Sequence, residues 1–169
     1  MKEQILCKLT AAGGRVSGEA LGSELGVTRA AVWKAVAALR EEGVDIESAP
    51  GGGYCLRTTP DSLREGCIAA RLETHFLGRR MTVLEQAAST NAVLRERAAA
   101  GAAHGETVLA RRQTAGRGRL GRSFYSPQDG GVYLSVYLAQ DFDPAQVTIR
   151  AAEAVHRAIR GLCGLTCDI

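Results

Sequence analysis

Residues 17–43 read SGEALGSELGVTRAAVWKAVAALREEG, and this stretch decides the fold of the first part of the chain. Ser17 and Thr28 are residue types that cap the amino ends of helices. Gly26 and Gly43 follow apolar segments with helical spacing, which is where glycine commonly ends a helix. The stretch therefore predicts a short helix, a tight turn and a second helix, the arrangement of a helix-turn-helix.

The residues on either side extend this unit. Residues 2–12 place three apolar side chains on one face and predict a preceding helix. Residues 44–57 read VDIESAPGGGYCLR, in which two strand-like segments flank a proline–glycine turn. A two-stranded hairpin after a helix-turn-helix makes a winged helix, which we assign to residues 1–60.

A winged helix can bind DNA by placing the second helix of its helix-turn-helix in the major groove. The expected DNA contacts are Ser17, Thr28, Arg29 and Lys34, with the wing glycines at the DNA backbone. The charge balance counts against this function, because residues 1–60 carry seven basic and seven acidic side chains, whereas a DNA-binding surface is usually basic. A helical interaction module of the same shape is the alternative.

The rest of the chain alternates between helical and strand-like patterns. RTTPDS at 57–62 breaks the periodicity and reads as a linker. The patterns then predict a helix over 62–74, a strand over 81–88, a helix over 90–100, strands over 106–113 and 130–138, and a helix over 144–162. We therefore expect an α+β protein whose second domain occupies residues 61–169.

The segment RRQTAGRGRLGRSFYSP at 111–127 differs from the rest of the chain in charge. It holds five arginines and no acid, so the net charge of +3 becomes −2 when these five are left out. Its glycines match the spacing GxGxxG, but a dinucleotide site requires a helix that begins inside this motif. A proline, paired glycines and a strand pattern follow instead, so we reject a dinucleotide site.

Without a helix dipole, side chains must hold any anion bound by this loop. Arg117, Arg119 and Arg122 suit that role, and the glycines let the backbone close over a ligand as a lid. Two alternatives are a solvated hairpin loop and a surface for single-stranded RNA, with Phe124 and Tyr125 as stacking platforms.

Ser89, Thr90 and Asn91 stand where the strand over 81–88 passes into the next helix. All three residue types cap helices, and capping is their commoner role. Three in a row exceed what one cap needs. The remaining hydroxyl and amide groups are therefore candidates for binding a polar, uncharged group of a ligand.

Three segments, AASTN at 87–91, QTAGRGRLGRSFYSP at 113–127 and GGVYLSV at 130–136, resemble the first half of the catalytic domain of biotin protein ligases. Residues 17–56 resemble the DNA-binding domain of the bifunctional members, the biotin operon repressors. The resemblance implies a winged helix followed by the first part of a mixed α/β catalytic sheet of the biotin/lipoate ligase type.

The resemblance also implies a reaction in two steps. Biotin and ATP, with Mg²⁺, give biotinyl-5′-AMP and pyrophosphate, and biotin then passes to a lysine of a biotin carboxyl carrier protein. Binding of the adenylate would promote a homodimer that binds operator DNA. The positions that match the family's sites are Ser89, Thr90, Asn91, Gln113, Gly116 and Arg117 for biotin, Gly118, Arg119, Gly121, Arg122 and Phe124 for the adenylate loop, and Arg117 and Arg119 for catalysis.

One segment that the resemblance implies does not occur in these 169 residues. In the family, a KWPND-like segment, whose lysine helps bind the biotin carboxylate and the phosphate, comes at about Ile169, and a further sheet and a small β domain follow it. We therefore expect these residues alone to ligate biotin poorly. The rival functions are a ligand-sensing winged-helix transcription factor without ligase activity and a lipoate-type ligase.

Composition limits the remaining possibilities. No apolar run is long enough to cross a bilayer and the first residues do not resemble a signal peptide, so we expect a cytoplasmic protein. The five cysteines are irregularly spaced and are expected to be reduced, small apolar residues, with zinc ligation as the alternative. We predict no protein-bound metal site.

Overall fold

The computed structural model describes residues 1–60, 63–118, 122, 124–126, 131–139 and 143–168. The chain divides into two compact units, Met1–Leu138 and Ala139–Ile169. Each unit is built from the elements that the sequence patterns predict, but one helix and the three strands of the second sheet are shorter than predicted.

The first unit opens with three helices, α1 (Lys2–Ala12), α2 (Gly18–Leu25) and α3 (Arg29–Glu41). The predicted caps are confirmed. Ser17 Oγ accepts a hydrogen bond from the Ala20 amide at 3.0 Å, and Thr28 Oγ1 accepts one from the Ala31 amide at 3.2 Å. Each hydroxyl satisfies an amide that the first turn of its helix leaves without a partner, which contributes about 1 kcal/mol.

These helices share one apolar core. Burying each leucine-sized side chain contributes about 1.5–3 kcal/mol, so this cluster is the main source of stability in the first unit. Its buried members are Ile5, Leu6 and Leu9 of α1, Leu21 of α2, Val32, Ala35, Val36 and Leu39 of α3, Val44 and Ile46 beside and in the hairpin, and Cys67.

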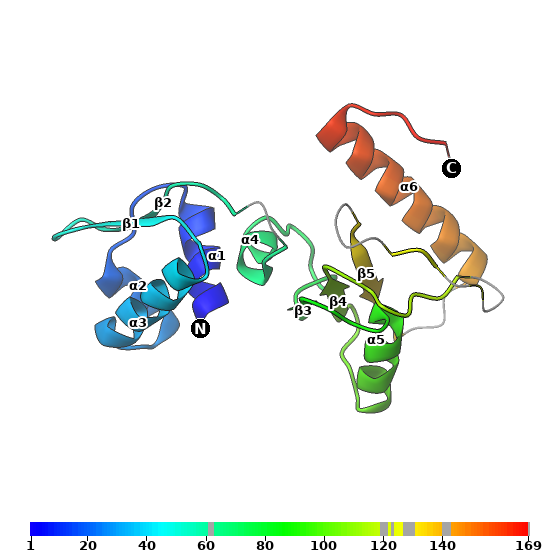
Figure 1. Ribbon diagram of the computed structural model, residues 1–169, viewed down its shortest axis with the longest axis horizontal. Coiled ribbons are helices and arrows are strands. Elements are labelled where there is room, and N and C mark those ends of the chain that lie inside the picture. Colours follow the sequence, from blue (N-terminus) through cyan, green and yellow to red (C-terminus); the bar gives the residue numbers. More distant parts are fainter. Residues whose placement is uncertain (61–62, 119–121, 123, 127–130, 140–142, 169) are drawn as a thin grey trace. The chain divides into compact units, whose positions relative to one another are not determined.

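A hairpin completes the winged helix. Its strands are β1 (Ile46–Ala49) and β2 (Gly53–Leu56), paired antiparallel, and Figure 1 shows the hairpin reaching past the three helices. Gly53 has a φ of 78°, and a Cβ there would lie 2.2 Å from the Val16 carbonyl oxygen, so only glycine fits. Arg40 ties the hairpin to α3 by donating to the Ile46 carbonyl oxygen at 2.8 Å and to Ser48 Oγ at 3.1 Å.

The helix after the linker is shorter than predicted. The pattern over 62–74 predicts one long helix, but α4 spans only Glu65–Ala69. The Arg71 guanidinium turns back to the Cys67 carbonyl oxygen at 3.0 Å and so satisfies a carbonyl that the helix end leaves free. The amino end of α4 is held on α1, because the Glu3 carboxylate accepts from the Gly66 amide at 2.8 Å and from Arg64 at 2.6 Å.

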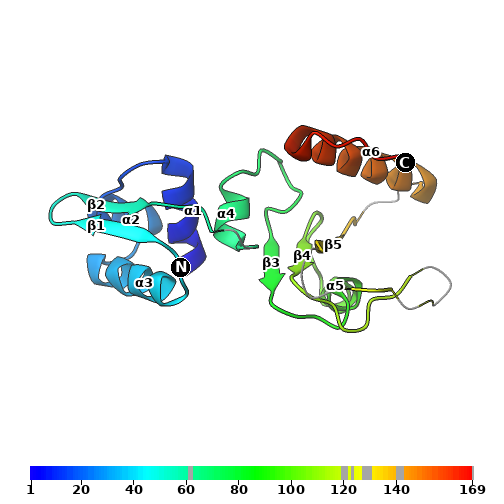
Figure 2. The same ribbon diagram turned by 45° about the horizontal axis from the view of Figure 1, so that its top comes forward.

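A three-stranded sheet follows, with strands β3 (Met81–Leu84), β4 (Thr107–Ala110) and β5 (Tyr133–Val136) in that order. β3 and β4 are parallel, and β4 and β5 are antiparallel. Helix α5 (Thr90–Ala99) connects β3 to β4 and packs on β4 and β5, as Figure 2 shows. Every residue of β4 is buried, as expected for the central strand. The prediction of an α+β protein with a mixed sheet is confirmed.

The second unit is a single long helix, α6 (Pro144–Cys163), and the residues after it. Asp143 caps this helix by accepting from the Ala145 amide at 3.0 Å, and Gly164 ends it with a φ of 68°. All five cysteines are free thiols, and Cys67 is the buried one. Within the described ranges, no helix combines the length and apolar character that a membrane span requires.

Candidate functional site

Four polar side chains meet where α5 begins. The Thr90 amide and the Thr90 hydroxyl both donate to Gln113 Oε1, at 2.8 and 3.1 Å. Ser135 Oγ of β5 lies 2.9 Å from Thr90 Oγ1 and 2.7 Å from Asn91 Oδ1, and its single proton can serve one of them at a time. Thr90 and Ser135 are 4% and 7% exposed and so are sheltered from water, whereas Gln113 is half-buried and Asn91 is exposed. Buried polar groups that satisfy one another in this way hold side chains in one geometry.

The backbone brings these residues together beyond the ends of two parallel strands. After β3 and β4, the chain continues as two adjacent segments, in which the Ala87 amide donates to the Arg112 carbonyl oxygen and the Thr114 amide donates to the Ala87 carbonyl oxygen, both at 3.0 Å. This pairing sets Gln113 beside the first residue of α5. Ligands of α/β proteins bind at the carboxyl ends of parallel strands, and this network occupies such a position.

The Gln113 side chain also caps α5, a role for which the sequence offered Ser89, Thr90 and Asn91 alike. Ser89 occupies the N-cap position of α5, but its side chain makes no capping hydrogen bond. Oε1 of the Gln113 side chain accepts from the Thr90 amide instead of the Ser89 hydroxyl. The Ser89 hydroxyl is therefore not used by the helix, and Ser89, Thr90 and Asn91 have three different environments rather than one shared role.

The glycine–arginine segment begins as a hairpin whose base rests on Gln113. The Phe124 amide donates to the Gly116 carbonyl oxygen at 3.0 Å, and the Gly118 amide donates to the Arg122 carbonyl oxygen at 2.7 Å. A Cβ on Gly116 would lie 2.9 Å from Ser126 Oγ and 3.2 Å from Gln113 Nε2. A side chain at this position would therefore displace the Ser126 hydroxyl and crowd Gln113, and glycine avoids both.

The arginines of this hairpin face solvent. Arg117 and Arg122 are exposed, and neither side chain has a hydrogen bond or an ion pair with any residue that the structure describes. Arg119 and Gly121, which the sequence assigns to the adenylate loop, lie outside the described residues. Phe124 is 57% exposed and borders a cavity of about 480 Å³ that Gln113 also lines. The cavity is completed by Arg112, Thr114, Tyr125 and Ser126.

Sequence reasoning missed Ser135. The alternation in GGVYLSVYL predicts that Val132, Leu134, Val136 and Leu138 lie on one face, and the first three are exposed together at β5. That face is the exposed one, and Tyr133 and Ser135 are buried on the other side. A serine in the middle of a strand, on the face opposite the apolar residues, was the available signal.

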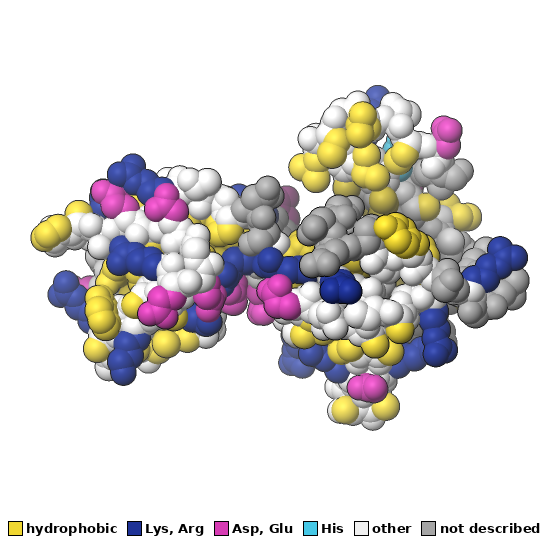
Figure 3. All heavy atoms as spheres, in the orientation of Figure 1, with side chains coloured by type: hydrophobic (Ala, Val, Ile, Leu, Met, Phe, Trp, Pro, Cys, Tyr) yellow, Lys and Arg dark blue, Asp and Glu magenta, His cyan; other side chains and the backbone are white. Residues whose placement is uncertain are grey.

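The winged helix holds a second set of predicted site residues. Arg29 and Lys34 are exposed on α3, whereas the Ser17 and Thr28 hydroxyls are engaged as helix caps. Trp33, which sequence reasoning did not single out, is 61% exposed on the same helix. On the face drawn in Figure 3, acidic and basic side chains are interspersed over the winged helix rather than gathered in one basic area.

Two family models match the chain. One, described as a helix-turn-helix domain, matches residues 2–55, and the other, described as the biotin/lipoate A/B protein ligase family, matches residues 83–166. Proteins named bifunctional ligase/repressor BirA are similar along most of the chain. That of Bacillus subtilis is 36% identical over 157 residues, which are 91% of this chain and 48% of that protein. That of Escherichia coli is 38% identical over 140 residues, which are 83% of this chain and 42% of that protein.

A helix-turn-helix domain is followed in this chain by a biotin/lipoate protein ligase domain. It spans about half the length of the curated relatives it matches. The segment that matches the ligase family includes the whole polar network of Thr90, Asn91, Gln113 and Ser135 and the arginine hairpin beside it. The helix-turn-helix match ends inside β2, so the winged helix precedes the segment that matches the ligase family.

Proposed function

We propose that this chain is the DNA-binding and first catalytic part of a biotin protein ligase that is also a transcriptional repressor. The polypeptide makes biotinyl-5′-AMP from biotin and ATP and transfers biotin to a lysine of a biotin carboxyl carrier protein. The observation that carries this proposal is Gln113, whose side chain joins the cap of α5 to the base of the glycine–arginine hairpin.

The polar network suits the neutral end of biotin. The ring system of biotin carries a urea group, which offers one acceptor and two donors. Gln113 uses its carbonyl oxygen within the network, but its NH₂ group has no hydrogen bond to a described residue. The Ser89 hydroxyl and the Asn91 amide nitrogen are likewise available. We assign Ser89, Thr90, Asn91 and Gln113, with Gly116 as the close backbone contact, to biotin binding.

The arginines suit the adenylation step. In that step, a carboxylate oxygen of biotin attacks the α-phosphorus of ATP and pyrophosphate leaves, so two anions must approach each other. Fixed guanidinium groups offset this repulsion and stabilise the charge of the transition state. We assign this role to Arg117 and Arg119, and we assign retention of the adenylate to the segment from Gly118 to Arg122 and to the Phe124 ring. The adenylate is a mixed anhydride, and a loop that closes over it would exclude water. ATP enters as its Mg²⁺ complex.

The winged helix supports the repressor role. Arg29 and Lys34 stand exposed on α3, the helix that a helix-turn-helix protein inserts into the major groove. Binding of the adenylate would favour a homodimer, and the dimer would bind operator DNA more tightly than the monomer does. By linkage, the adenylate and the operator then strengthen each other's binding. We place the boundary between the two functions near residue 60 and the whole protein in the cytoplasm.

The test uses the whole natural polypeptide that carries this chain. Incubation with biotin, ATP and Mg²⁺ is expected to leave biotinyl-AMP bound to the protein, detectable by mass spectrometry after rapid gel filtration. Arg117→Ala is expected to reduce the retained adenylate at least tenfold. Arg95→Ala, an exposed arginine on α5, is the matched control and should retain it in full. If the unchanged protein forms no adenylate yet binds DNA in a biotin-dependent manner, it is a sensor rather than a ligase.

A further inference from the structure

The basic side chains of the winged helix are nearly all engaged within the domain. Residues 1–57 carry seven Lys and Arg side chains. Five of them have partners, in the pairs Lys2–Glu42, Lys8–Glu24, Arg15–Glu47, Arg57–Glu47 and Arg40 with the β1 strand. Arg29 and Lys34 are the two without a hydrogen bond or ion pair among the described residues. Arg29 and Lys34 are therefore the cations of the domain that no described group engages, and Arg40, whose partners are neutral, lines the same groove as Arg29.

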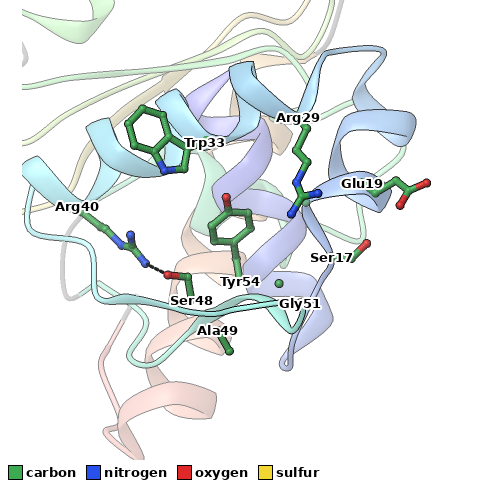
Figure 4. Close-up of a pocket in the computed structure, with 11 residues that line it drawn as sticks. Ser17, Glu19, Arg29, Trp33, Arg40, Ser48, Ala49, Gly51 and Tyr54 are labelled. Carbon is green, nitrogen blue, oxygen red and sulfur yellow. Dashed lines mark hydrogen bonds between the residues drawn. The ribbon is translucent and has the colours of Figure 1, made fainter.

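A groove beside these two cations is lined by aromatic rings. It has a volume of about 250 Å³ and lies between α3 and the wing. Figure 4 shows the indole nitrogen edge of Trp33 and the hydroxyl of Tyr54 turned toward this space from opposite sides, with the Arg29 guanidinium beside them. Neither the Trp33 indole N–H nor the Tyr54 hydroxyl has a hydrogen-bond partner in the part of the chain that the structure describes.

We propose that this groove holds a phosphate group of the DNA backbone, with the Trp33 indole N–H, the Tyr54 hydroxyl and the Arg29 guanidinium as its donors. An indole and a guanidinium donate hydrogen bonds and accept none. A set of donors fits a phosphate, whose oxygens only accept, better than a base edge, which mixes donors and acceptors. The inference rests on the proposed DNA-binding function, and it specifies which chemical group of the DNA the groove of the winged helix binds.

Glu19 lines the same groove and is the carboxylate nearest to the proposed site. Figure 4 shows its carboxylate turned away from the Tyr54 hydroxyl and the Trp33 ring. It has no ion pair with a described residue, so it would repel a phosphate bound here. Glu19→Gln is therefore expected to tighten DNA binding by about twofold to fivefold at low salt, and the gain should shrink as salt increases.

The proposal predicts an unusually weak dependence of DNA affinity on salt. Each phosphate that a cation neutralises adds about −0.9 to the slope of log K against log salt concentration. Two free cations give a slope of about −1.8 for each winged helix, whereas seven would give about −6. Neutral donors such as an indole or a phenol add affinity without changing this slope, because they release no counterions.

The experiment measures binding of this chain to a fluorescent mixed-sequence 20-base-pair duplex by anisotropy, from 25 to 200 mM KCl. Phosphate contacts carry no sequence information, so no operator is needed. Tyr54→Phe keeps the ring and removes only the hydroxyl donor, whereas Trp33→Phe keeps an aromatic ring but loses the indole N–H together with part of the ring area. Each is expected to raise Kd about fivefold to tenfold with an unchanged slope. Arg29→Gln should flatten the slope by about 0.9. Tyr137→Phe, in the sheet domain, removes a hydroxyl outside the winged helix and should have no effect.

Separate results would overturn the inference and the proposed function. Unchanged affinity in both Phe variants overturns the phosphate site. No binding of the unchanged chain to the duplex at 25 mM KCl overturns DNA binding itself. Because Tyr54 packs on the domain core, its variant is compared for thermal stability. If Tyr54→Phe is destabilised, the exposed Trp33→Phe decides the result alone.

Discussion

Replacing Gln113 with alanine tests whether one side chain organises the candidate biotin site. Gln113→Ala removes the acceptor that receives both the amide and the hydroxyl of Thr90. Loss of a helix cap costs about 1 kcal/mol, and the buried Thr90 hydroxyl, which keeps only Ser135 Oγ as a partner, loses a hydrogen bond that contributes about another 1 kcal/mol. We therefore expect the sheet of the first unit to lose about 2 kcal/mol, which raises its opening equilibrium about 30-fold.

Hydrogen–deuterium exchange measures this loss where it occurs. The amides of the buried strand β4, residues 107–110, should exchange about 30-fold faster in Gln113→Ala than in the unchanged chain. Trp33, the single tryptophan, reports on the winged helix, and its urea transition should not move. Gln113→Glu is the matched control, because a carboxylate oxygen can still accept from both Thr90 groups. It should preserve slow exchange in β4 and still abolish biotin binding, since it lacks the amide donor. Equal exchange in the Ala and Glu variants would refute the reasoning.

Two further perturbations test the winged helix. Gly53→Ala should destabilise the domain by about 3 kcal/mol, because its Cβ would overlap a backbone carbonyl oxygen. Gly51 has a φ of 69° and open space around it, so Gly51→Ala should cost about 1 kcal/mol. Equal urea midpoints for the two variants would contradict this contrast. Hydrogen bonds from Lys2 and Arg64 hold the pKa of Glu42 below its ordinary value of 4.5. The stabilisation from this depressed pKa is present at neutral pH and is lost as the pH falls through the folded-state pKa. Glu42→Gln should therefore make the urea midpoint, followed by Trp fluorescence, less sensitive to acidification. Parallel pH profiles of the variant and the unchanged chain would contradict this expectation.

The winged helix could be predicted closely because its signals are local. Ser17 and Thr28 cap the helices that they precede, and Gly26 ends α2 with a φ of 65°. Each of these features depends on residues within one turn of the chain. The length of α4 was wrong because the alanine-rich pattern continues beyond the point where the Arg71 side chain ends the helix.

The candidate site could be predicted only in part because its partners are far apart in sequence. Thr90 was found from its residue type and Gln113 from the resemblance to biotin protein ligases, but the register of β4 against β5 decides that Ser135 meets Thr90. The apolar alternation in β5 indicated a strand and not which face is buried. Packing of α5 on the sheet makes that choice, and the sequence of β5 alone does not contain it.

The central claim is that adenylate formation and DNA binding belong to one coupled protein. The measurement is the affinity of the whole polypeptide for duplexes that it selects from a random pool, with and without biotin and ATP. We predict that biotin and ATP together raise this affinity at least fivefold, that neither does so alone, and that Gln113→Glu abolishes the increase. The same affinity with and without both substrates would contradict the account.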